Sequence, residues 1–245
     1  DLDQDGMRTD HLDIVLADLK QKDVRPKYIF TIPTVQNPSG SVMSMERRLE
    51  LLELSKTYSV PIFEDDCYAD LLWEGERPPA IRSLDPTGRV IYCGSFSKSI
   101  APAFRVGYLV ADWNVIAQIL PLKTDGGTGA LEQMVLAEYA KNNFDQHVLN
   151  LQHVLRDKCQ TMADVLNEQF GATAEFVIPK GGIFIWITLP ASINTTELAQ
   201  VALTEGVAIN PGAEWVADPV MGRNRLRLCF ASPSKQEIID GVKAL

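Results

Sequence analysis

Several features that mark particular classes of protein are scarce in this 245-residue sequence. Its four cysteines form no Cys-x-x-Cys pair, and its three histidines show no metal-ligand spacing, so neither a disulfide framework nor a zinc site is predicted. No apolar run approaches the roughly 20 residues of a membrane-spanning helix. Acidic residues outnumber basic ones by 32 to 23, and the net charge of −9 argues against non-specific binding to nucleic acid or to a membrane surface.

The composition that remains is that of a globular protein with a real core. Hydrophobic residues make up 46% of the chain and charged residues 22%, so neither disulfides nor a metal is needed to hold it together. Isolated cysteines in apolar segments are typical of small buried residues in a reducing compartment, and we expect a cytoplasmic location. The acidic, polar start of the chain, DLDQDGMRTD, does not have the pattern of a signal peptide.

In the first half of the chain, short apolar runs alternate with helix-like stretches. The runs that predict buried strands are 27–33, 59–65, 89–94 and 105–111. The stretch 44–58 predicts a helix that Ser44 could cap. Near-continuous apolar strands that alternate with helices are typical of a parallel sheet covered on both faces.

The second half has a different pattern. Residues 128–170 predict a helical region interrupted near Asn142 and Asn143, and Gly171 suits a helix end. The elements expected beyond it are strands at 174–179, 183–190, 206–210 and 225–231, a helix at 195–204 and a final helix capped by Ser234. This half predicts an α+β arrangement. We therefore expect an α/β domain with a mostly parallel sheet over 1–142 and a small α+β domain over 143–245.

Two polar segments directly follow predicted strands. Residues 36–40, QNPSG, contain Asn37 and by themselves indicate only a turn. Residues 64–68, EDDCY, place Asp65 and Asp66 where open α/β sheets bind ligands, although helix capping by either aspartate explains them equally well. A carboxylate that stays charged on burial there needs a cationic partner.

The run that begins at Gly94, GSFSKSIAPAFRVGY, gathers groups that bind phosphate. Gly94 lets the backbone approach a ligand closely, Ser95 and Ser97 supply hydroxyls, and Arg105 supplies a guanidinium. Most lone lysines are solvated surface residues. Lys98, at the end of a buried strand and among these donors, is a candidate for a Schiff base.

A pair of arginines marks the last predicted strand. Arg225 and Arg227 alternate with leucines in RLRLCF, so both side chains share one face of the strand. Taken alone, the pattern predicts a solvent-exposed face as readily as an anion-binding one.

The order of these segments is more specific than any one of them. Asn-Pro-Ser-Gly, Asp-x-x-Tyr, Ser-x-Ser-Lys followed seven residues later by Arg, and Arg-Leu-x-Phe together resemble the signature of fold-type I pyridoxal 5′-phosphate (PLP) aminotransferases, over nearly the whole chain. The runs EDDCYADL and GGIFIWI look like the branch that holds aminoadipate, kynurenine and aromatic aminotransferases and the aminotransferase-like domains of MocR-type regulators. The resemblance implies PLP as cofactor, an amino acid and a 2-oxo acid as substrates, and a homodimer.

The resemblance also implies roles around the cofactor ring. Lys98 would hold PLP as a Schiff base and later shuttle a proton. Asp65, which stands three residues before Tyr68, would pair with the pyridine nitrogen, and the adjacent Asp66 lies off the motif. Tyr68 and Asn37 would hydrogen-bond the 3′ oxygen, and we also expect Asn37 to contact the substrate.

Further roles concern the two anionic groups. Ser95, Ser97 and Arg105 would hold the phosphate. Arg227 would bind the substrate α-carboxylate with a two-pronged contact, and it is preferred over Arg225 because it begins the Arg-Leu-x-Phe pattern.

The resemblance lacks one part of the family pattern. Family members carry a long stretch before the point that matches the start of this chain, with a loop that completes the phosphate site and a ring-stacking aromatic residue. We therefore expect a fragment that alone binds PLP weakly and turns over little. Three functions share the residues above. They are an aminotransferase, which Asn37 favours, the PLP-sensing domain of a MocR-type regulator, whose helix-turn-helix would bind DNA, and a PLP lyase or decarboxylase.

Overall fold

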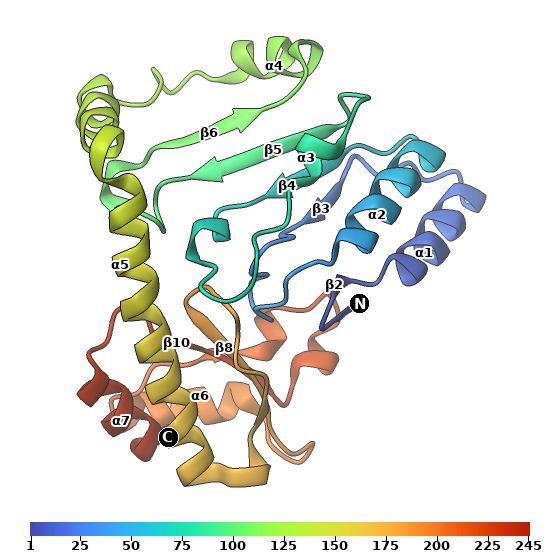
Figure 1. The fold of residues 1–245 in the computed structure, drawn as a ribbon. Coiled ribbons are helices and arrows are strands. Elements are labelled where there is room, and N and C mark those ends of the chain that lie inside the picture. The colour runs from blue at the N-terminus through green and yellow to red at the C-terminus, as the bar shows by residue number, and fades with distance from the viewer. The chain divides into compact units, whose positions relative to one another are not determined.

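The computed structural model describes residues 1–245 and divides into two compact units (Figure 1). The first unit comprises Asp1–Gln36 and Ser41–Asn150, and the second comprises Asn37–Gly40 and Leu151–Leu245. The division falls within one helix, α5 (Ala130–Phe170), in which the predicted boundary at residue 142 also lies.

The first unit contains a four-stranded sheet in the order β3-β4-β5-β6. Its strands are β3 (Ile29–Thr31), β4 (Ile62–Asp65), β5 (Val90–Ser95) and β6 (Gly107–Val110). The first three are parallel, with Ile62 opposite both Ile29 and Val90, so the prediction of a mostly parallel sheet is confirmed.

The last strand, β6, departs from the predicted pattern. It is antiparallel to β5 and all four of its residues are exposed, so it is not a buried parallel strand. The connection 96–106 holds only the short turn η2 (Pro102–Phe104). A parallel pair needs a crossover of about a dozen residues or more, usually with a helix, so the chain returns antiparallel instead.

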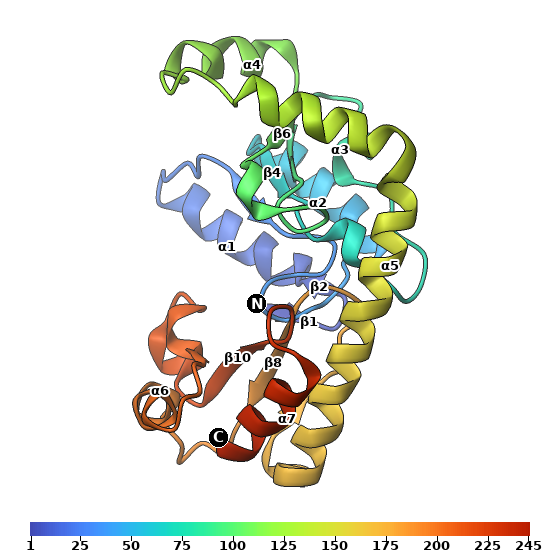
Figure 2. The ribbon, with the colours of Figure 1, turned by 90° about the vertical axis from the view of Figure 1, so that its left-hand side faces the viewer.

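The first unit contains the helices α1 (Thr9–Gln21), α2 (Met45–Tyr58), α3 (Ile81–Leu84) and α4 (Trp113–Ile119), with the short elements β1 (Leu2–Asp3), β2 (Gly6–Met7), η1 (Ala69–Leu71) and η3 (Leu120–Leu122). Helices α1, α2 and α3 contribute residues to the core beside the sheet, whereas α4 has no buried residue. Helices α1 and α2 lie side by side in both views (Figures 1 and 2). Leu16 and Leu51 from these helices join Ile62 and Val90 in one buried cluster. Ser44 caps α2 as predicted, accepting a hydrogen bond from the Arg47 backbone N–H.

The second unit is built on an antiparallel sheet in the order β7-β8-β10-β9. Its elements are β7 (Glu175–Phe176), β8 (Phe184–Thr188), β9 (Asn210–Pro211), β10 (Arg225–Cys229), α6 (Thr195–Thr204), α7 (Lys235–Ala244), η4 (Gly171–Thr173), η5 (Gly212–Glu214) and η6 (Pro219–Gly222). Ile185, Ile187, Leu226 and Leu228 form the buried face of β8 and β10. Side chains alternate along a strand, so Arg227 lies on the opposite face. Helices and an antiparallel sheet confirm the predicted α+β arrangement.

Two local predictions for the second half of the chain are wrong. Helix α5 runs without a break through both asparagines, and the side-chain amide of Asn143 donates to the Tyr139 carbonyl (3.0 Å) one turn back. The strand expected over 206–210 shrinks to β9, because the N–H of Val207 bonds back to the Ala202 carbonyl and closes the end of α6. None of the helices combines the length and hydropathy needed to cross a lipid bilayer.

Candidate active site

Most of the predicted cofactor residues meet at one edge of the parallel sheet. Asp65 is the last residue of β4, and Ser95 is the last residue of the adjacent strand β5. Tyr68 follows three residues after β4, and Ser97 and Lys98 follow directly after β5. The carboxyl ends of neighbouring parallel strands lie together, so the structure brings these five residues to the place where open α/β sheets bind ligands.

The amine of Lys98 lies close to the other groups at this edge. Its Nζ atom is 6.0 Å from the centroid of the buried Tyr68 ring, and it makes no ion pair or hydrogen bond. The pKa of the Cys67 thiol is affected by the charges of both Asp65 and Lys98. Burial is the main cause that raises the pKa of Cys67 to about 12, the Asp65 carboxylate raises it further, and the Lys98 charge opposes them. The amine and the carboxylate are therefore within electrostatic reach of the same thiol.

The two neighbouring aspartates have different surroundings. Asp66 is buried, forms an ion pair with Arg77 (3.0 Å) and accepts a hydrogen bond from the Tyr92 hydroxyl (3.2 Å). Asp65 is half-buried and accepts from the backbone N–H of Cys67 at 3.3 Å. Asp66 is thus ion-paired within the fold through Oδ2, although its buried Oδ1 atom has no partner, and Asp65 is the carboxylate that makes no ion pair and is suited to a cationic ligand group.

One of the phosphate-type donors, Arg105, has a strained backbone. Ser95 Oγ accepts a hydrogen bond from the Ser97 backbone N–H (3.1 Å), and the exposed Arg105 guanidinium makes no hydrogen bond or ion pair. Arg105 has a left-handed φ of 51°, and so does the β-branched Val35, at 58°, just before the QNPSG turn. A left-handed non-glycine residue costs about 1–2 kcal/mol. Strain of this kind clusters at functional sites.

Two features near Lys98 were not predicted from the sequence. The group that approaches Gly94 is the ring of Tyr108 across the β5–β6 pair, where a Cβ on residue 94 would lie 2.7 Å from Cε1. Ser99 was not considered, yet its side chain is buried and its Oγ atom has no hydrogen-bond partner. The signal that could have identified it is the third serine of the run SFSKS.

A second cluster surrounds Arg227 in the second unit. Its Cζ atom lies 3.6 Å from the ring centroid of Trp215 and 3.9 Å from that of Phe184. Nη1 donates to Asn37 Oδ1 (2.8 Å), and Nη2 donates to Asn210 Oδ1 (2.9 Å). The predicted pair Asn37 and Arg227 is therefore brought together. The other three residues were missed, because no local pattern indicates that they meet.

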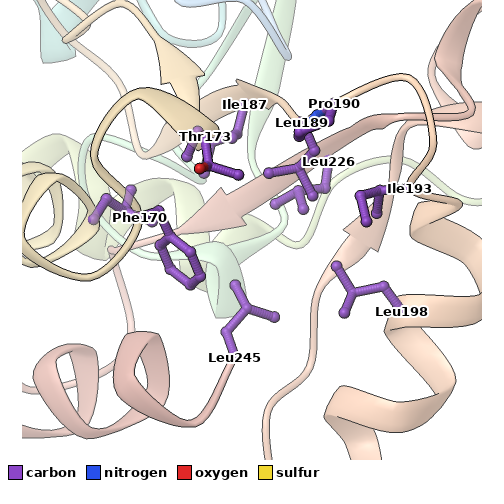
Figure 3. Close-up of a pocket in the computed structure, with 11 residues that line it drawn as sticks. Phe170, Thr173, Ile187, Leu189, Pro190, Ile193, Leu198, Leu226 and Leu245 are labelled. Atoms are coloured by element: carbon purple, nitrogen blue, oxygen red, sulfur yellow. The ribbon is translucent and has the colours of Figure 1, made fainter.

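The apolar cavity of the second unit is not the site of the chemistry. It has a volume of about 180 Å³ and is lined by side chains such as Phe170, Ile187, Leu226 and Leu245 (Figure 3). No lining residue is titratable, so the cavity offers no acid, base or nucleophile.

Comparisons with known proteins agree with the motif order. The family model of aminotransferase class I and II matches residues 3–245. An uncharacterised aminotransferase of Saccharolobus solfataricus is 37% identical over 243 residues, covering 98% of this chain and 60% of the relative. The transcriptional regulator NorG of Staphylococcus aureus is 35% identical over 216 residues, covering 86% of this chain and 48% of the regulator.

A solved structure agrees on the fold. The kynurenine aminotransferase of Pyrococcus horikoshii, solved in complex with PMP, superposes with a TM-score of 0.93 at 34% identity, covering 99% of this chain and 61% of the other. The chain therefore spans about three-fifths of the length of this structure and of the relative from Saccharolobus solfataricus. These matches confirm the α/β fold and the resemblance predicted from the motifs, and the chain belongs to the aminotransferase class I and II family.

Proposed function

We propose that the intact protein transfers an amino group from an amino acid to a 2-oxo acid with PLP as its cofactor. The observation that carries the proposal is the convergence of Asp65, Ser95 and Lys98 at the carboxyl edge of β4 and β5. An amine, a carboxylate and hydroxyl donors at one sheet edge match the groups that PLP presents. The family membership and the PMP complex of the Pyrococcus horikoshii relative support the same cofactor.

The residues at this edge fit PLP group by group. A phosphate dianion needs hydroxyl and guanidinium donors, and Ser95, Ser97 and the unpaired Arg105 supply them. An aldehyde needs an amine that is not committed to an ion pair, as Lys98 provides. The buried Ser99 hydroxyl has no hydrogen-bond partner within the fold. A bound ligand can supply that hydrogen bond.

When bound, PLP supplies an electron sink that stabilises negative charge on the substrate Cα atom. Lys98 would attach the cofactor and, once displaced, move the proton at Cα as a general acid–base group. Asp65 would hold a proton on the pyridine nitrogen through a charge-assisted hydrogen bond, worth about 1.5–3 kcal/mol in stability. Tyr68 and Asn37 would donate hydrogen bonds to the 3′ oxygen of the ring.

Arg227 would orient the substrate. Its planar guanidinium can bind the α-carboxylate through two parallel N–H···O bonds, a geometry that lysine cannot reproduce. Asn37 already contacts Arg227 and would lie beside the same substrate group. The pairing of these two side chains within one unit supports their assignment to the substrate.

The domain roles and the assembly are also proposals. Residues 1–142 would be part of the PLP-binding large domain, and residues 143–245 would form the small domain. We propose a cytoplasmic homodimer.

A second function is favoured by one observation. The identity of 35% to the regulator NorG means that the intact protein could instead use the site to sense PLP and control transcription. The enzyme is preferred because the Saccharolobus solfataricus aminotransferase has a higher sequence identity to this chain than NorG and matches more of its length. A helix-turn-helix in the full-length gene product would favour the regulator.

The decisive experiment traps the cofactor on the full-length protein. We expect PLP to give a yellow absorbance, borohydride to fix it, and peptide mapping to find the label on Lys98. K98A should lose the label, and K141A, at an exposed lysine of α5, should keep it. Label on another lysine would refute the site.

A second measurement separates the candidate functions once Lys98 carries the label. Amino acids should convert the colour and release the matching 2-oxo acid if the protein is an aminotransferase. Stable colour with no product would favour the regulator, and β-elimination products would favour a lyase.

A further inference from the structure

The guanidinium of Arg227 is packed against two aromatic rings. Its Cζ atom lies 3.6 Å from the ring centroid of Trp215 and 3.9 Å from that of Phe184. At these distances each ring contributes cation–π attraction to the same guanidinium.

The edges of the same plane are held by two neutral amides. Asn37 Oδ1 accepts from Nη1 and Asn210 Oδ1 accepts from Nη2. Asn210 on β9 is the cross-strand partner of Arg227 on β10, so the sheet register sets this contact. The two rings and the two amides together fix the orientation of the guanidinium, and two-pronged binding of a carboxylate requires a guanidinium plane that is fixed.

The backbone around Trp215 is built to bring its ring to this place. The Trp215 backbone N–H closes the turn η5 on the Gly212 carbonyl (3.0 Å). A Cβ on Gly212 would lie 2.5 Å from the Arg225 carbonyl oxygen and closer still to that of Gly222, so the two glycines permit the turns to touch. The turn that carries Trp215 is thus packed directly against the start of β10.

The indole N–H indicates which part of Trp215 is used. Its Nε1 atom is buried and has no hydrogen-bond partner. Because this N–H makes no hydrogen bond, it does not itself hold the guanidinium of Arg227. The part of Trp215 that contacts the Arg227 guanidinium is therefore its ring.

From these contacts we infer that Trp215 is a positioning residue whose ring, together with that of Phe184, holds the Arg227 guanidinium in the orientation that receives the substrate carboxylate. The inference rests on the proposed function, because it takes Arg227 as the carboxylate-binding group. It predicts that the ring face matters and that the indole nitrogen does not.

The first test reads the position of Arg227 without any reaction. In the full-length protein labelled with ¹⁵N, the Nε–H resonance of Arg227, assigned by its loss in R227K, should be shifted by the currents of both rings. W215L should move it towards the ordinary arginine position, and W215F should keep most of the shift. W113L is the matched control, because Trp113 is 69% exposed on α4.

The second test uses pyruvate, a small 2-oxo acid that carries the carboxylate and almost no side chain. W215L should weaken pyruvate binding by roughly threefold to thirtyfold, the equivalent of one desolvated cation–π contact, while W215F and W113L stay close to the unsubstituted protein. In turnover, W215L should raise KM by a similar factor with little change in kcat, because a binding contact shared by ground and transition states is lost.

The outcomes distinguish this inference from the proposed function. An unshifted Arg227 resonance, or pyruvate bound by W215L as tightly as by the unsubstituted protein, overturns the positioning role and leaves the proposed function standing. A loss in W215F as large as in W215L shows that the indole nitrogen matters and also overturns it. If the unsubstituted protein binds neither pyruvate nor any other 2-oxo acid, the proposed function fails and the inference fails with it.

Discussion

Arg48 is the buried charge on which the first unit most depends. Its side chain is fully buried on α2 and donates to the carbonyls of Pro33 (3.0 Å), Met43 (3.0 Å) and Pro79 (3.2 Å) and to the Thr34 hydroxyl (3.0 Å). Two of these acceptors lie just before the QNPSG turn. Removal of the guanidinium would therefore leave several buried acceptors without a donor next to a predicted site loop.

We predict that R48M lowers the free energy of unfolding by about 3–5 kcal/mol, the usual loss when one partner of a buried charged network is removed. Four charged hydrogen bonds at roughly 1.5–3 kcal/mol each would sum to more, but losses within one network are not additive. Urea denaturation followed by circular dichroism measures the change. R25M, the same substitution at an exposed arginine, should stay within about 0.5 kcal/mol.

The pH dependence of R48M tests the reasoning further through Glu64. Burial raises the pKa of the Glu64 carboxyl, two backbone N–H bonds from Ile81 and Arg82 oppose the rise, and the Arg48 charge, 4.0 Å away, also lowers it. A carboxyl with a raised folded-state pKa contributes stability that is present below its unfolded pKa and is lost as the pH rises through the folded one. Without Arg48 the folded pKa rises further, so the loss in R48M should grow with pH.

The double variant R48M/E64Q should reduce this pH dependence, because Glu64 can no longer ionise, although the Asp66 carboxylate also acts on Arg48. A loss below about 1 kcal/mol in R48M would refute the assigned role of the network. A loss in R48M that does not change with pH, or one whose pH dependence is as large in R48M/E64Q, would refute the coupling to Glu64.

Three further predictions concern other parts of the chain. Alkylation at pH 8, mapped by mass spectrometry, should modify the exposed Cys229 well before Cys67. Burial raises the pKa of Cys67 to about 12, so only about one Cys67 thiol in ten thousand is ionised at pH 8. Equal rates of alkylation would contradict this. G94A should lower the free energy of unfolding by about 1–3 kcal/mol, because its methyl group overlaps the Tyr108 ring. Adding Y108L to G94A should recover part of that loss, and no recovery would point to another cause. S234A should cost about 1 kcal/mol in the same denaturation assay by removing the capping box of α7, and an unchanged midpoint would show that the cap contributes nothing.

Features set by a few neighbouring residues could be predicted from the sequence. Helix α6 has the bounds expected from its pattern, and Ser44 and Ser234 cap the helices that they precede. The order of the motifs was sufficient to predict the family, because each motif is short and its spacing from the others can be read along the chain. The alternation of Arg227 with leucines also placed its side chain on the polar face of β10.

Features that depend on distant residues were decided by the tertiary structure. The antiparallel direction of β6 follows from a short connection that must fold back beside β5. The stacking of Trp215 on Arg227 needs the approach of two glycine turns, and the Asn210 contact needs the register between β9 and β10. Local patterns encode backbone preference and which side chains are buried. They do not encode which buried or aromatic groups meet, because those contacts form only when segments far apart in sequence are packed together.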